Sequence, residues 1–270
     1  LTITRNIRSG IVYVGMFGYC TRATITNLTL EDVCYSVVSG ADKNDIGAYV
    51  GGLVAFGNLT NITNVKVLGE IKLSLCASNP AHVGGIAGGL NVYDKDTAYI
   101  AHVQNCVSEV KTVAEAFEDG DASVLDSVVN GGIVGAISST SNGALAILNC
   151  VSNGSVEGGE WVGGIVGYAT GSAELSGTDD TNTNGRNDNY VIGCSYVGGV
   201  IGANADIDLT KTQEDTGNSS GDTLVLVEKG AIPFQTGRIQ ALSMQPVCMQ
   251  EVSVVIIQVL CLKILIHRVQ

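Results

Sequence analysis

The sequence predicts an all-β fold, a β-solenoid like a parallel β-helix, built from repeats of about 33 residues. Three observations predict it. A glycine-rich phrase recurs along the chain, an asparagine phrase follows most copies, and both phrases alternate side chains with a period of two. Such alternation is typical of strands, because successive side chains point to opposite faces. A repeat this short cannot bury two strands alone, whereas stacked copies bury a continuous core.

The glycine phrase has five clear copies and one shorter copy, YVGMFGY, at 13–19. The clear copies are YVGGLVAF at 49–56, HVGGIAGG at 82–89, NGGIVGAI at 130–137, WVGGIVGY at 161–168 and YVGGVIGA at 196–203. Glycine weakens a strand unless a backbone must approach closely. Its recurrence in phase therefore predicts a column in which neighbouring layers touch, formed by Gly51, Gly84, Gly131, Gly163 and Gly198.

The asparagine phrase returns as ATITNLTL at 23–30, NITNVKVL at 61–68, AHVQNCVS at 101–108, AILNCVSN at 146–153 and, less clearly, VIGCSYV at 191–197. We expect its asparagines to form a hydrogen-bonded ladder of buried amides, made of Asn64, Asn105 and Asn149 with Asn27. Asn27 also lies in a glycosylation sequon, which a buried position would exclude. Cys106, Cys150 and Cys194 are expected to share one column, as small buried side chains or as disulfide partners.

The first glycines are spaced by 33, 47, 32 and 35 residues, and the long interval needs an insertion. SEVKTVAEAFEDG at 108–120 places Val110, Val113, Ala114 and Phe117 on one face of a helix. We therefore expect a short helical insertion near 108–119, which forms a binding face or covers an edge of the solenoid.

These phrases resemble the GLUG motif, a short repeat of large bacterial and some protist surface proteins, including adhesins and IgA-peptidase-like proteins. The resemblance is clearest over residues 46–210 and strongest at 130–170. It implies an extended β-helical, surface-exposed repeat region, with any activity in separate domains, and it supplies no catalytic residues. The long loops at 90–100 and 171–190 and the final 33 residues depart from the motif.

The chain divides into a degraded N-terminal repeat at 1–45, GLUG-like solenoid repeats at 46–210, a terminal or capping segment at 211–237, and an apolar tail at 238–270. The tail contains no glycine, although the chain has 35. It is interpreted as a buried strand pair, as an error of reading frame or gene model, or as a membrane or lipid anchor. The chain begins without methionine, so we expect an internal part of a longer protein.

Composition narrows the classes of function. Hydrophobic residues make up 45% of the chain and charged residues 15%, a balance that argues against disorder. The net charge of −12 repels phosphate backbones, so no nucleic-acid partner is expected. We expect no membrane span by the repeat region, because even the apolar run at 252–266 is shorter than the ~20 residues that a spanning helix needs.

A polar loop at 177–190, GTDDTNTNGRNDNY, is the candidate site. Asp180, Asn182 and Asn184, followed by a glycine, fit the first six positions of a calcium loop, whose alternate oxygens face one ion. Asp188 falls at the ninth position, but the twelfth is a valine instead of a bidentate glutamate. Weak calcium binding is the prediction, and a polar turn-rich loop without metal is the alternative. We expect no other cofactor.

Enzyme activity is not expected, although β-helices also host carbohydrate-active enzymes. The adjacent acids at 179–180 and the GRIQ sequence at 237–240 are weak indications of a polysaccharide hydrolase or lyase, which needs two carboxyl groups roughly 5–10 Å apart across a cleft. His82, His102 and His267 are dispersed, and no HExxH or GxSxG motif occurs. We expect a non-catalytic structural or adhesive region of a secreted or cell-surface protein, presenting loops to a host or cell-surface protein or glycan.

Overall fold

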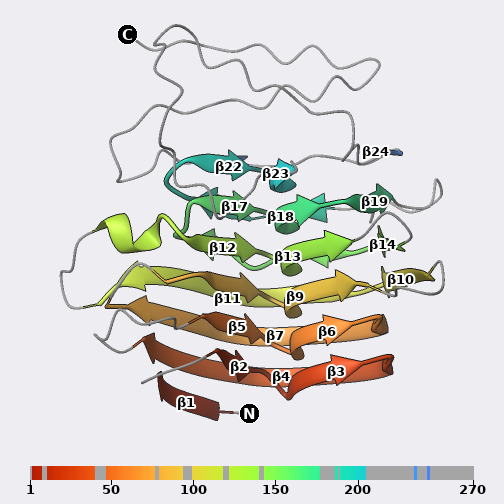
Figure 1. Cartoon of the computed structure of the whole chain (residues 1–270), viewed down its shortest axis with the longest axis horizontal. Helices are drawn as coiled ribbons and strands as arrows, with labels where there is room; N and C mark the ends of the chain where they lie inside the picture. The colour runs from red at the N-terminus through yellow and green to blue at the C-terminus, as the bar shows by residue number, and fades with distance from the viewer. Residues whose placement is uncertain are drawn as a thin grey trace, which may run out of the picture.

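The described part of the chain winds through six stacked layers, as the computed structural model shows (Figure 1). The structure describes residues 2–7, 11–39, 47–76, 79–93, 99–117, 122–139, 143–176, 186–187, 189–204, 234–235 and 242–243. Each layer contributes to three sheets, called A, B and C here, and successive layers pair in parallel. The predicted all-β solenoid is therefore confirmed.

Sheets B and C contain the two halves of the glycine phrase, one strand of each per layer. In layer order, sheet B comprises β2 (Val12–Val14), β5 (Ala48–Gly51), β8 (Ala81–Gly84), β12 (Val128–Gly131), β17 (Trp161–Gly163) and β22 (Tyr196–Gly198). Sheet C comprises β3 (Phe17–Thr21), β6 (Val54–Asn58), β9 (Ala87–Val92), β13 (Val134–Ser139), β18 (Val166–Thr170) and β23 (Ile201–Asn204). The shorter phrase at 13–19 thus forms a layer of the same kind.

Sheet A contains the asparagine phrase and the segment that returns to sheet B. One long strand crosses it in layers 1 and 2, and two or more shorter strands replace that strand from layer 3 onward. Its strands are β1 (Thr2–Ile7), β4 (Thr24–Ser39), β7 (Asn61–Leu75), β10 (Tyr99–Gln104), β11 (Val107–Ala116), β14 (Gly143–Leu148), β15 (Val151–Ser152), β16 (Val156–Glu157), β19 (Ser172–Ser176), β20 (Arg186–Asn187), β21 (Tyr190–Ile192), β24 (Phe234–Gln235) and β25 (Leu242–Ser243).

The glycine column is confirmed, because the five predicted glycines pair in register from layer to layer. Its main physical cause is a sharp corner between sheets B and C. A Cβ atom on Gly51 would overlap the carbonyl oxygen of Val54 in the same layer, and the other four meet the same obstacle three residues on. Backbone of the following layer is the next obstacle at Gly51 and Gly84, so the predicted contact between layers is also present.

Aliphatic side chains fill the space inside the corner. The residue after the second glycine is fully buried in every layer from 2 to 5, as Leu53, Ile86, Ile133 and Ile165. Asn130 interrupts the neighbouring column of valines. Its amide nitrogen donates to the carbonyl oxygens of Glu157 (3.0 Å) and Gly158 (3.1 Å), which ties sheet B to the returning strand.

The predicted helical insertion near 108–119 is wrong. Val107–Ala116 form strand β11, which pairs with β7 over ten residues. Alternate side chains point inward, so Val110, Thr112 and Ala114 are buried while the side chains that alternate with them are more exposed. The segment matches a period of two as well as a helical period, and backbone pairing with a neighbouring layer decides between them.

The long 47-residue interval has two other causes. The connection from β9 to β10 is longer than the corresponding connections in the neighbouring layers. The return from β11 to β12 also contains a one-turn 3₁₀ helix, η1 (Ala122–Leu125). Within the described residues no helix is long and apolar enough to cross a bilayer.

Candidate functional site

The proposed calcium ligands Asp180, Asn182, Asn184 and Asp188 lie outside the described residues. Calcium binding by this loop therefore stays a prediction. In the part of the chain that the structure describes, no three His, Cys, Asp or Glu side chains gather closely enough to hold a metal ion.

The asparagine ladder exists, but it is not buried. The side-chain amide of each asparagine donates to the amide oxygen of the preceding one, over 3.0 Å from Asn64 to Asn27 and 3.1 Å for the links from Asn105 and Asn149. All four residues adopt φ between 53° and 56°, the left-handed conformation that asparagine tolerates at corners. The ladder faces outward, so burial does not exclude glycosylation of Asn27.

The cysteine column contains two of its three predicted members. Cys106 and Cys150 are fully buried free thiols on neighbouring layers, and burial raises the pKa of Cys150. The prediction that Cys194 belongs to this column is wrong. Cys194 lies after β21, where its backbone N–H donates to the carbonyl oxygen of Gly159. The VIGCSYV match placed a returning strand where the asparagine phrase was expected.

Aromatic side chains form two columns along sheets B and C near their common corner. Tyr13, Tyr49 and His82 stack on sheet B, with ring centroids 5.6 Å and 4.7 Å apart, while Tyr19 stacks on Phe56 on sheet C at 5.4 Å. Burial lowers the pKa of His82 to about 4, so its imidazole is neutral at physiological pH. Trp161 and Tyr196 repeat the arrangement in layers 5 and 6, 6.2 Å apart.

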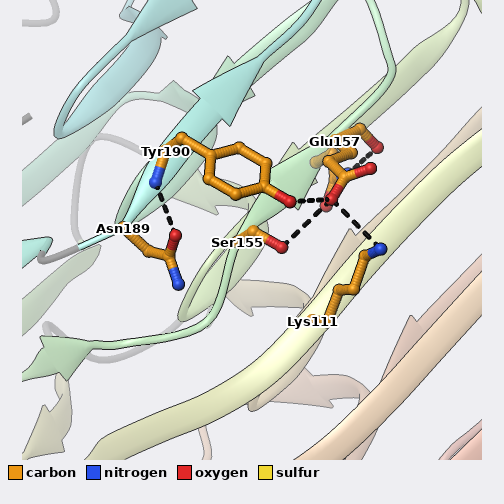
Figure 2. A network of polar contacts seen from close by, with 6 residues as sticks. Lys111, Ser155, Glu157, Asn189 and Tyr190 are labelled. Carbon is orange, nitrogen blue, oxygen red and sulfur yellow. Dashed lines mark hydrogen bonds and ion pairs between the residues drawn. The ribbon is translucent and has the colours of Figure 1, made fainter. Parts of the chain in front are cut away.

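A polar network centred on Glu157 joins three layers of sheet A (Figure 2). Its carboxylate accepts hydrogen bonds from the Tyr190 hydroxyl (2.7 Å) and the Ser155 hydroxyl (3.1 Å), and it pairs with the Lys111 ammonium (3.3 Å). These groups come from β11, from β16 and the residue preceding it, and from β21. The backbone N–H of Tyr190 donates to the Asn189 side chain, which fixes the start of β21.

The Glu157 network is suited to holding layers together. Burial opposes ionisation of Glu157, but the hydrogen bonds from Tyr190 and Lys111 outweigh it and lower the pKa of the carboxyl. An ionised carboxylate surrounded by three donors is a poor proton donor. Two further ion pairs join layers 2 and 3 in the same way, Lys66 with Glu109 and Lys72 with Glu115, both at 2.8 Å.

Glu160 is the one described carboxyl group whose pKa is raised into the physiological range. Burial, and to a smaller extent the negative charge of Asp126, together raise it to about 7. Glu160 precedes the aromatic Trp161, and its backbone N–H donates to the carbonyl oxygen of Val128. Sequence reasoning missed both Glu160 and the residues of the Glu157 network. Lys111 and Glu157, for example, lie 46 residues apart and form no local motif.

Comparison with known proteins gives one informative similarity. Over 213 residues, covering 75% of this chain, the sequence is 29% identical to halomucin from Haloquadratum walsbyi. The match covers 2% of halomucin, so the chain spans a very small part of that protein. No family model matches the chain. No solved structure matches it.

Proposed function

We propose that this chain is a non-catalytic structural and adhesive region of a secreted or cell-surface protein, which presents loops along a rigid stack. The observation that carries the proposal is the continuity of its columns. The corner glycines pair in register through layers 2 to 6, and the asparagine ladder and the cross-layer ion pairs add bonds in the same direction. An arrangement that repeats along one axis suits a stalk or a scaffold.

The similarity to halomucin supports a location at the cell surface. The GLUG resemblance of the glycine phrases supports the same assignment and adds the adhesive role. The partner is then a host or cell-surface protein or a glycan, recognised by the connections that leave the sheets. The Glu157 network supports a structural role for the most connected polar side chains, because its donors all serve one carboxylate.

Adhesion can be tested with beads that carry the chain at controlled density. We expect them to bind at least one of four coated surfaces, a mannan, a sialylated mucin, fibronectin or collagen, more than beads coated with serum albumin do. Calcium can be varied in the same assay, since weakening by a chelator and by Asp180→Ala would assign the binding to the loop at 177–190. Binding no stronger than that of the albumin control on all four surfaces would contradict the adhesive role.

The raised pKa of Glu160 supports a polysaccharide hydrolase or lyase as the second candidate function. A carboxyl group with a pKa of about 7 beside a second acid, Asp126, has the property of a general acid. Release of reducing ends or unsaturated sugars from a panel of polysaccharides, abolished by Glu160→Gln and kept by Glu109→Gln, would establish the enzyme. Glu109 is a suitable control because its carboxylate forms an ion pair with the Lys66 ammonium.

A further inference from the structure

Cys106 and Cys150 occupy equivalent corners of layers 3 and 4. The residues that follow them, Val107 and Val151, pair in register, and so do the residues two positions before them. The corners are also joined directly, because the N–H of Val151 donates to the carbonyl oxygen of Cys106 over 2.9 Å. Each cysteine therefore lies opposite the other. Paired strands lie about 4.8 Å apart, which is within the Cα separation of about 4.4–6.8 Å that a disulfide requires.

Both cysteine side chains lie in the core, and a hydrogen bond joins the two thiols. Each cysteine follows a ladder asparagine in the left-handed conformation, Asn105 or Asn149, so the two corners have the same backbone conformation at that position. The Cys150 thiol also contacts the carbonyl oxygen of Val103 in layer 3 at 3.4 Å. The sulfur of Cys150 is thus turned toward the layer that contains Cys106.

Among the six described cysteines, the register between layers places only these two opposite each other. Cys20 and Cys34 belong to layer 1, and the residues opposite them in layer 2 are a glycine and a glutamate. Cys76 and Cys194 follow the returning strands β7 and β21, which belong to layers 2 and 5. The described fold therefore brings one pair of thiols into position for a cross-link.

The pair also joins the two layers that are separated by the longest stretch of chain. The corner glycines of layers 3 and 4, Gly84 and Gly131, are 47 residues apart, whereas the other intervals between the five glycines are 32 to 35 residues. A longer loop costs more conformational entropy to close, and a covalent link across it removes more of that cost. A cross-link between layers 3 and 4 is therefore placed where it stabilises the stack most.

We propose that Cys106 and Cys150 form a disulfide that joins layers 3 and 4 when the chain meets a small disulfide oxidant, such as oxidised glutathione. One cysteine thiolate attacks the oxidant, breaks its S–S bond and releases one small thiol. The second thiolate attacks the resulting mixed disulfide, forms the Cys106–Cys150 bond and releases the second small thiol. Two electrons and two protons thus pass from the chain to the oxidant.

The burial of both sulfurs determines when the exchange takes place. The oxidant reaches them only while the corner is open, during folding or during local unfolding of layers 3 and 4. The structure describes the reduced form, in which both thiols are free. The inference takes its oxidising surroundings from the proposed location outside the cell, where disulfides persist. Formation of the bond in the purified chain is measured without reference to adhesion, so the two proposals fail independently.

The purified full chain can be incubated with oxidised glutathione in urea just below its unfolding transition, so that burial does not limit the exchange. The remaining thiols are then blocked with N-ethylmaleimide, and the chain is digested without a reductant. We expect mass spectrometry to find Cys106 joined to Cys150 in most molecules. Alkylation of both cysteines would overturn the proposal, and so would a bond from either one mainly to glutathione or to another cysteine.

Resistance to urea supplies a second readout. Oxidation should raise the urea midpoint of the unaltered chain by about 1 M, because the cross-link restricts the unfolded state. Cys150→Ala should abolish this rise, whereas the matched control Cys34→Ala, at an exposed cysteine of layer 1, should keep it. The rise compares the oxidised and reduced forms of one protein, so a variant of lower stability still reports it.

The cross-link found in the unaltered chain stands even if Cys150→Ala fails to fold. An equal rise of the urea midpoint in Cys150→Ala and Cys34→Ala would overturn the proposal, because the stabilising bond would then lie between other cysteines. A midpoint that oxidation leaves unchanged in the unaltered chain would overturn it as well.

Discussion

The side-chain nitrogen of Asn105 donates a hydrogen bond to the side-chain oxygen of Asn64, 3.1 Å away in the preceding layer. Both residues hold a left-handed backbone, with φ of 54° and 55°. Asparagine thus serves the corner twice, by tolerating this conformation and by linking the layers. The two contributions can be separated by substitution.

Asn105→Ala should lower the free energy of unfolding by about 2 kcal/mol, because alanine loses the ladder bonds and is strained at positive φ. Asn105→Gly should cost about half as much, since glycine accepts the backbone but makes no ladder bond. Chemical denaturation of both variants measures the difference. Equal losses would mean that backbone conformation plays no part.

Gly131→Ala should destabilise the chain by about 3 kcal/mol, because the new Cβ atom overlaps the carbonyl oxygen of Val134 at the corner. The reverse exchange at Ala144, a half-buried residue of β14, should cost at most about 1 kcal/mol. Thermal and denaturant unfolding of the two variants tests the corner. A Gly131→Ala variant as stable as the Ala144→Gly control would refute the steric explanation.

Glu157→Gln should reduce stability at neutral pH but not in acid. The pKa of Glu157 is lower in the folded chain than the ordinary 4.5, so its contribution is present above that value and is lost as the pH falls through the folded pKa. The stability difference between the native chain and the variant should therefore shrink as the pH falls below 4.5. Tyr190→Phe, which removes the 2.7 Å donor, should cost about 1 kcal/mol at pH 7. A pH-independent difference would mean that the network does not favour the ionised carboxyl.

His82→Phe should make the chain more resistant to mild acid. The folded pKa of His82 is about 4 against 6.5 for a free imidazole, so the neutral ring stabilises the fold above pH 6.5 and this stabilisation is lost as the pH falls toward 4. Phenylalanine keeps the stacking on Tyr49 without the proton. Urea midpoints measured between pH 7 and 4 should fall less in the variant. An identical decline in both proteins would place the acid sensitivity elsewhere.

Glu160 has the opposite pH dependence over an overlapping range. Its folded pKa of about 7 exceeds the ordinary 4.5, so its contribution to stability is present below pH 4.5 and is lost as the pH rises through 7. Glu160→Gln should therefore gain about 1 kcal/mol relative to the native chain at pH 8, after allowance for the screening of a half-exposed group, and nothing at pH 4. Unfolding at the two pH values, with Glu109→Gln as control, checks both sign and size.

Local pattern was sufficient for the strands of the glycine phrase. The residues of YVGGLVAF and WVGGIVGY alternate, and their glycines recur in phase, so the stacking of Gly51 on Gly84 and of Gly163 on Gly198 could be predicted. The helix expected near 108–119 shows the limit. Val110 and Ala114 fit both a helical face and a strand face, and only the partner strand β7 distinguishes them.

The candidate sites could be predicted from the sequence less well than the fold. Asn64 and Asn105 were identified as ladder partners, but their exposure depends on which side of the corner turns outward. Cys194 was assigned to the wrong column because loops of unequal length shift the phrases between layers. Lys111 meets Glu157 only through the register of two layers.

The sequence alone determined what repeats, because periodicity and glycine recurrence are properties of neighbouring residues along one chain. It therefore specified parallel strands stacked in layers, with bare positions in line. The tertiary structure decided which residues come into contact: which charges pair and which thiols are buried. Those outcomes depend on register between segments 32 to 47 residues apart, where backbone pairing and desolvation act on partners that no local pattern identifies.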